Sequence, residues 1–180
     1  MTAEISAANE SDPPLELAAH PKMKIMIVDD EPLNVALLED ILAGSGYSRI
    51  QSVTDPRLAQ QTWESFLPDL VLLDLNMPFI DGFTLLESLR VLSRELFLPI
   101  AILTADASEE TKRRALRAGA TDFLLKPFDA VEVLLRIGNM LEIRQRHLQL
   151  EMQRGALQDA MRERASELRE ARPEVAHVTW

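Results

Sequence analysis

From residue 24 onward, short apolar runs alternate with longer stretches in which apolar side chains recur every three or four residues. The short runs are typical of buried strands, and the longer stretches are typical of amphipathic helices. We expect strands at 24–28, 49–53, 70–73, 100–103 and 121–124, and helices at 32–43, 56–66, 83–92, 108–118 and 129–141. Strand and helix units that alternate in this way predict a parallel sheet covered by helices on both faces.

The boundaries of these elements support the same assembly. Pro32 and Pro56 stand where helices should open, and Gly44 and Gly119 stand where helices should end. The run at 70–73 is apolar throughout, as in strands buried on both faces, and connections between parallel strands are right-handed. We therefore predict an α/β fold, a flavodoxin-like doubly wound five-stranded parallel sheet in the order 2-1-3-4-5, followed by a long C-terminal α-helix.

The composition divides the chain into four segments. Residues 1–22 mix Ala, Ser, Glu and Pro without a periodic pattern, so we expect a disordered leader there. Residues 23–141 should form the compact domain. Residues 142–173 are rich in Arg, Glu, Gln and Leu, which favours a helical extension, and residues 174–180 should form a tail.

The helical extension carries a heptad pattern. One seam position contains Val133, Met140, His147, Arg154, Met161 and Leu168, and the other contains Arg136, Ile143, Leu150, Leu157, Arg164 and Ala171. Polar residues at several of these positions lower the stability of a coiled coil. We expect a weak coiled coil and a homodimer, parallel or antiparallel, through this helix.

Charge and composition restrict the partners of the protein. The 180-residue chain has a formal net charge of −10, which disfavours binding to nucleic acid or to an anionic membrane surface. It has no cysteine and therefore no disulfide or thiolate metal site. No signal-like segment and no apolar run long enough to span a membrane occur, so we predict a cytoplasmic protein without membrane insertion.

Carboxylates follow two of the expected strands. Asp29 and Asp30 come directly after the first strand, and Asp74 comes directly after the third. Ligands bind at the carboxyl edge of open parallel sheets, so these side chains should meet there. Carboxylate oxygens suit Mg²⁺, and the backbone carbonyl of Asn76 could complete the protein ligands. The cluster predicts metal-assisted phosphoryl transfer in which Asp74 is the nucleophile.

Two further polar residues end the fourth and fifth strands. Thr104 could donate a hydrogen bond to a transferred phosphoryl group, and Lys126 could place a positive charge against it. Pro127 follows Lys126, and a cis bond between them would direct the lysine inward. With the three carboxylates, these positions describe a single site.

These residues resemble the receiver domain of two-component response regulators (CheY-like). The resemblance covers roughly residues 24–141 and rests on Asp29-Asp30-Glu31-Pro32, Asp74-Leu75-Asn76-Met77-Pro78, Asp81-Gly82, Thr104-Ala105 and Lys126-Pro127-Phe128. It implies that Asp74 is the phosphoacceptor, Asp30 the direct Mg²⁺ ligand with Asp29 beside it, Thr104 the switch hydroxyl and Lys126 the phosphoryl partner. It also implies a sensor histidine kinase or phosphotransfer protein as the phosphodonor.

The resemblance assigns two further roles. Phe123 stands where the family keeps a switch aromatic that is often tyrosine, so a contact through a phenolic hydroxyl is ruled out here. Asn76 and Asp106 each lie two residues past a key position, where the family tunes the lifetime of the phosphoryl group. Our hypothesis is that they orient a water for fairly rapid self-hydrolysis.

Other functions remain open at this point. A Mg²⁺-dependent phosphatase of the haloacid-dehalogenase type also uses an Asp nucleophile, but it needs a second acid where this chain has Asn76. A scaffold with an idle site is a third possibility. Residues 148–175 resemble the helical linkers that join receivers to HD-GYP cyclic-dinucleotide phosphodiesterase domains, so the chain could be the N-terminal regulatory fragment of such an enzyme. We expect no enzymatic activity beyond self-phosphorylation and self-dephosphorylation.

Overall fold

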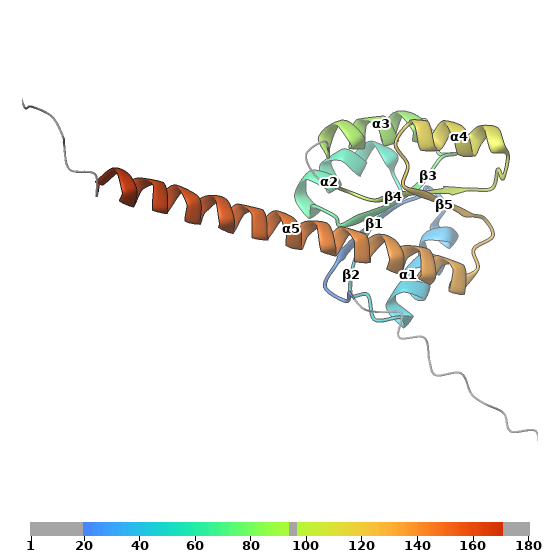
Figure 1. The fold of residues 1–180 in the computed structure, drawn as a ribbon. Coiled ribbons are helices and arrows are strands. Elements are labelled where there is room, and N and C mark those ends of the chain that lie inside the picture. The colour runs from blue at the N-terminus through green and yellow to red at the C-terminus, as the bar shows by residue number, and fades with distance from the viewer. Residues whose placement is uncertain (1–19, 94–96, 171–180) are drawn as a thin grey trace, which may run out of the picture.

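A computed structural model describes residues 20–93 and 97–170, and Figure 1 shows their arrangement. The elements in chain order are β1 (Lys24–Val28), α1 (Pro32–Gly44), β2 (Arg49–Val53), the short 3₁₀ helix η1 (Pro56–Leu58), α2 (Ala59–Phe66), β3 (Leu70–Asp74), α3 (Gly82–Leu92), β4 (Ile100–Thr104), α4 (Glu109–Arg117), β5 (Asp122–Leu125) and α5 (Ala130–Glu170). The strands are parallel and lie in the order β2-β1-β3-β4-β5. The predicted fold class and strand order are confirmed.

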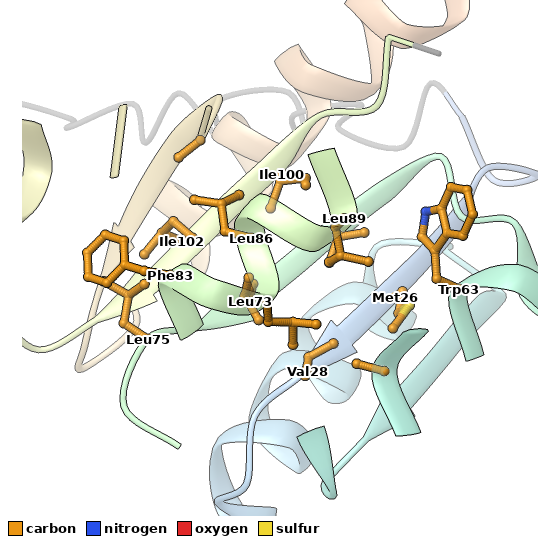
Figure 2. Close-up of a cluster of buried hydrophobic side chains, with 14 of the residues drawn as sticks. Met26, Val28, Trp63, Leu73, Leu75, Phe83, Leu86, Leu89, Ile100 and Ile102 are labelled. Carbon is orange, nitrogen blue, oxygen red and sulfur yellow. The ribbon is translucent and has the colours of Figure 1, made fainter. Parts of the chain in front are cut away.

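Helices α2, α3 and α4 cover one face of the sheet. Successive strand side chains point to opposite faces, so Met26 and Val28 of β1 and Leu73 of β3 share this face. Figure 2 shows them packed beneath Trp63 of α2 and Leu86 of α3. All but Trp63 are fully buried, which explains why the strands read as continuous apolar runs.

Helix α1 and the first three turns of α5 cover the opposite face. Ile27 and Leu72 contribute from the sheet, Leu38 from α1, and Val133 and Ile137 from α5. These side chains are almost completely buried. The two layers leave the strand ends as the accessible edges of the sheet.

Strands β3 and β4 extend one residue beyond their predicted ranges, and β5, predicted at 121–124, is shifted by one residue to Asp122–Leu125. Asp74 is the last residue of β3 and Thr104 is the last residue of β4, because Asp74 pairs with Leu103 and Thr104 pairs with Leu125 across the sheet. The helix expected at 56–66 also begins differently. Residues 56–58 form a 3₁₀ turn in which the Asp55 side chain accepts a hydrogen bond from the amide of Arg57.

Helix α5 runs without a break through the predicted boundary at residue 141 and projects beyond the sheet (Figure 1). Arg144 fixes the helix where it leaves the domain: its guanidinium donates to the carbonyl oxygen of Phe97 at 3.0 Å and lies 3.5 Å from Asp69. The His147 ring lies 5.4 Å from the ring of Phe97. The domain therefore holds α5 up to His147.

The beginning of the predicted heptad seam lies inside the domain. Val133 and Met140 are buried against the sheet, and Arg136 pairs with Asp122 of β5. Val133 and Met140 cannot contact another helix because the domain already covers them, and Arg136 is engaged by Asp122. A coiled coil can begin only near Ile143. The predicted leader (apart from residues 20–22), the end of the helical extension and the tail lie outside the described residues.

No helix in the described part of the chain is long and apolar enough to cross a membrane.

Candidate functional site

The strand registers bring the predicted site residues to one edge of the sheet. Val28 pairs with Leu73, so Asp29 at the end of β1 lies beside Asp74 at the end of β3. Thr104 ends β4, and Lys126 follows β5 directly. The backbone amide of Lys126 donates to the carbonyl oxygen of Thr104 at 2.8 Å, which continues the sheet to the last site residue.

An acidic cluster forms the centre of this edge. Asp29, Asp30 and Asp74 each offer one carboxylate oxygen, and these oxygens lie within 4.8 Å of one another. Asp29 and Asp74 are buried, whereas Asp30 is partly exposed. Hard oxygen donors in this arrangement fit Mg²⁺, which binds one or two carboxylates and retains several waters. The donor set and its open side therefore suit the predicted metal.

Asp29 is held by groups close to it in the sequence and by a lysine from the far side of the domain sequence. Its Oδ1 accepts a hydrogen bond from the amide of Glu31 at 2.9 Å, and its Oδ2 lies 2.8 Å from the Lys126 ammonium. The Asn34 amide nitrogen of α1 donates to both oxygens, at 3.3 and 3.2 Å. Asn34 was missed by the sequence reasoning. Its place one helical turn after the acidic pair was a usable signal.

Lys126 also contacts Asp74, with 3.1 Å between Nζ and Oδ1, and the Lys126-Pro127 peptide bond is cis. Burial raises the pKa of the Asp74 carboxyl, and this effect outweighs the lowering by Lys126. Burial also acts to lower the pKa of Lys126, but its contacts with Asp29 and Asp74 leave that pKa raised. The lysine thus balances charge between two buried carboxylates.

Thr104 is linked to the start of α4. Its hydroxyl oxygen accepts a hydrogen bond from the backbone amide of Asp106 at 3.0 Å. The Asp106 carboxylate accepts hydrogen bonds from the amide of Ser108 at 2.8 Å, from the Ser108 hydroxyl at 3.0 Å and from the Thr111 hydroxyl. The hydrogen bond from Thr111, then those from Ser108, hold the pKa of Asp106 below its usual value.

This network bears on the self-hydrolysis hypothesis. Both oxygens of Asp106 are engaged by Ser108 and Thr111, so the carboxylate also fixes the start of α4, and its role toward a water stays a prediction. The Asn76 side chain is exposed in the β3–α3 loop and stays a candidate for that role. Metal binding by the Asn76 carbonyl also stays a prediction.

Phe123, the predicted switch aromatic, lies in β5 between two cationic side chains. The Lys112 ammonium of α4 lies 4.9 Å from the ring centroid, and the Arg136 guanidinium of α5 lies 5.8 Å from it. The ring is partly buried and packs against the core below α3 and α4. Cations attracted to the π-face at these distances connect α4, β5 and α5 through one side chain.

A second feature absent from the sequence reasoning lies on the β3–α3 loop. Phe79 has φ of 73° and is 79% exposed, and the Arg57 guanidinium lies 4.7 Å from its ring centroid. Asp55 fixes Arg57 with an ion pair of 2.8 Å. Left-handed backbone at a bulky residue is unfavourable and has no sequence signal of its own, so only the structure locates this contact.

Comparison with known proteins decides the family. The response regulator receiver domain matches residues 25–138. This chain belongs to that family. As a receiver domain of a two-component response regulator, it is expected to receive phosphoryl groups from a histidine kinase or phosphotransfer partner, and receiver domains typically use Mg²⁺ at an acidic Asp cluster such as the one described above.

Several relatives illustrate the extent of the match. The chain is 36% identical over 118 residues to the DNA-binding dual master transcriptional regulator RpaA of Synechocystis, which covers 66% of this chain and 48% of that protein. It is 39% identical over the same length to the alkaline phosphatase synthesis transcriptional regulatory protein PhoP of Bacillus subtilis, again covering 66% and 48%. The receiver thus spans about half the length of these curated relatives.

The solved structures extend the match to three dimensions. A putative response regulator from Chloroflexus aurantiacus is similar at 35% sequence identity with a TM-score of 0.62, covering 67% of this chain and 98% of that one. The similarity therefore takes in nearly the whole of that protein but leaves a third of this receiver protein unmatched.

Proposed function

We propose that this receiver is a phosphorylation-dependent signalling switch that accepts a phosphoryl group on Asp74 from a phosphohistidine. The contact between Asp74 and Lys126 at 3.1 Å, beside Asp29 and Asp30, is the observation that carries the proposal. It combines a nucleophile, a fixed cation and oxygen ligands for a divalent ion at the open edge of the sheet. Phosphoryl transfer requires little more, because positioning and charge stabilisation do most of the catalytic work.

Each side chain has a defined task in the transfer. An Asp74 oxygen forms a bond to phosphorus as the bond from phosphorus to the histidine nitrogen breaks, and the electron pair of that bond stays on the imidazole. Asp29, Asp30 and Asp74, with the Asn76 carbonyl, would hold Mg²⁺, which neutralises charge on the phosphoryl oxygens. Lys126 supplies a second positive charge, and Thr104 supplies a hydroxyl donor.

The signal would leave the site through two contacts of the structure. When the Thr104 hydroxyl turns toward a phosphoryl group, the amide of Asp106 loses its acceptor, and Asp106 holds the first turn of α4. Space vacated by Thr104 lets Phe123 turn inward, away from Lys112 and Arg136. Phosphorylation thereby shifts the population of α4 and α5 positions.

The long helix α5 is the proposed output, through dimerisation or through a change in its orientation. The first turns of α5 contact β5 through the ion pair of Arg136 with Asp122 at 2.9 Å, and the same helix continues into the projecting part. An alternative is that α5 connects the receiver to a further domain, such as an HD-GYP phosphodiesterase. The match covers about half the length of RpaA and of PhoP, which agrees with either arrangement.

The proposed chemistry is confined to the protein itself. A haloacid-dehalogenase-type phosphatase would need an acid at Asn76 to protonate a leaving group, and an amide cannot do so. Cytoplasmic location and the lack of nucleic-acid binding remain predictions from the sequence and its charge.

The test is treatment of the full chain with acetyl phosphate or beryllofluoride in the presence of Mg²⁺. We expect acetyl phosphate to add the mass of one phosphoryl group to the native protein and to Asp40→Asn, an exposed acid on α1, but not to Asp74→Asn. Beryllofluoride should increase amide exchange in the first turn of α4. Equal modification of Asp74→Asn and the native protein would overturn the proposal.

A further inference from the structure

A single apolar stripe runs along the projecting part of α5. Ile143, Leu150, Leu157, Met161 and Leu168 are each at least 51% exposed. At about 100° per residue they fall within about 40° of one line along the helix, over a rise of about 38 Å. Among the described residues nothing packs on this stripe, and an apolar stripe of this length suits contact with another helix.

Arg154 and Arg164 decide how a second helix can lie on the stripe. Arg154 and Arg164 lie at opposite edges of the stripe, and both are exposed. In a parallel pair in register, each seam residue faces its own copy, so Arg154 meets Arg154 and Arg164 meets Arg164. Two layers of like charge then oppose association.

An antiparallel pair centred between Gly155 and Ala156 removes the contact between the two copies of Arg164 and moves the two copies of Arg154 into adjacent layers, about 4.5 Å apart along the axis. Positions whose numbers add up to the same total then face each other, so Ile143 lies opposite Leu168 of the second copy and Leu150 lies opposite Met161. Arg154 lies opposite Leu157, which its aliphatic stem can cover while the guanidinium reaches water. The remaining layer pairs His147 with Arg164, beside the contact between His147 and Phe97.

Charges beside the seam agree with this alignment. On the two flanks of the seam the facing positions add up to 313 and to 309, instead of the 311 of the seam. Arg146 therefore lies opposite Glu167 of the second copy at both ends of the pair, and Glu151 lies opposite Gln158, so no like charges meet. A parallel pair would also form an attractive contact, between Arg146 and Glu151. The flanking charges therefore permit both orientations, and the arginines of the seam favour the antiparallel one.

We propose that the stripe of α5 binds a second copy of this chain in an antiparallel helix pair. The inference deepens the proposed homodimerisation but does not depend on phosphorylation of Asp74. It places the two receiver domains at opposite ends of the paired helices.

Disulfide cross-linking tests the orientation directly, because the chain has no cysteine of its own. Leu150→Cys and Met161→Cys proteins are oxidised separately and as a mixture, and peptide mass spectrometry identifies the linked positions. We expect a link between positions 150 and 161 in the mixture and none in either protein alone. Met152→Cys, which is about 180° from the stripe, serves as the control and should not link.

Two results would overturn the proposal. Cross-linking of each variant with itself would show a parallel pair, and no link in the mixture, with both thiols reactive toward maleimide, would show that the stripe does not bind a second copy. A charge exchange gives independent evidence: Arg146→Glu should weaken dimerisation in sedimentation experiments, and the addition of Glu167→Arg should restore it. Acetyl phosphate labelling of the same variants reports separately on the phosphoacceptor.

Discussion

Lys126 Nζ lies 3.1 Å from Oδ1 of Asp74, although β4 separates the strands β5 and β3 that carry these residues to the site. The same ammonium lies 2.8 Å from Asp29, so one cation is shared by two buried carboxylates. Lys126 therefore does not fully offset the cost of burying the charged Asp74 carboxylate, and burial raises the pKa of Asp74 in spite of Lys126. This arrangement makes the phosphoacceptor a destabilising residue in the folded protein.

Asp74→Asn should stabilise the metal-free fold at neutral pH by about 1 kcal/mol, the order of the cost of a buried polar group with incomplete hydrogen bonding. Because the folded-state pKa is raised, the contribution of Asp74 is fully present below its usual pKa of about 3.9 and is lost as the pH rises through the folded-state value. The gain from the substitution should grow across that interval. Urea unfolding in chelator over a pH series measures it, and a pH-independent difference would contradict the prediction.

Asn34→Ala should reduce Mg²⁺ affinity about tenfold, although Asn34 is not itself a proposed ligand. Its amide donates to both oxygens of Asp29 and restricts their orientation, and loss of such support commonly lowers metal affinity by at least this factor. Calorimetric titration with Mg²⁺ provides the measurement. Leu33→Ala, an adjacent exposed substitution, is the control, and equal affinities in all three proteins would show that Asn34 does not position Asp29.

Asp106→Ala should accelerate amide exchange in the first turn of α4. The carboxylate accepts hydrogen bonds from Ser108 and Thr111, and these anchor the start of the helix. Acidification should lower the protection of the same amides relative to their intrinsic exchange rates, because the pKa of Asp106 is lowered and its stabilising contribution is lost as the pH falls. Hydrogen exchange resolved by peptide is the readout. Asp55→Ala, which removes the cap of η1, should leave exchange in α4 unchanged.

Gly82→Ala should destabilise the domain by about 3 kcal/mol or more. A Cβ at this position would lie 2.5 Å from both the Asp74 carbonyl oxygen and the Leu75 Cα, and backbone atoms cannot move aside cheaply. Gly155→Ala is the matched change in α5, where a Cβ would have no neighbour within 4 Å. It should increase helicity, with a gain of about 1 kcal/mol in helix propensity. Thermal unfolding followed by circular dichroism compares the two.

Local patterns were enough to predict the strands and the strand order. The central strands β1, β3 and β4 are short, almost entirely apolar runs because helices cover both faces of the sheet, whereas the edge strand β2 keeps polar residues. Asp74 and Thr104 were placed one residue outside their strands because periodicity cannot show where backbone pairing stops. Pairing of Asp74 with Leu103 and of Thr104 with Leu125 sets those ends.

The heptad pattern shows the limit of reasoning from one helix. Val133 and Met140 fit a seam as well as Leu150 and Leu157 do, yet the sheet covers the first two and leaves the others exposed. Sequence spacing does not tell which surface an apolar residue contacts. The anchoring of Arg144 to Phe97 and Asp69 marks the point where the domain releases the helix.

The sequence by itself determined the α/β architecture, the acidic pair, the phosphoacceptor candidate and the long C-terminal helix, because each depends on residues close together in the chain. Only the tertiary structure decided that Lys126 is shared between Asp29 and Asp74, that Asn34 supports Asp29, and that Phe123 lies between Lys112 and Arg136. These contacts join separate strands and helices. Their distances depend on how the whole domain packs, and the sequence of a short segment does not determine that packing.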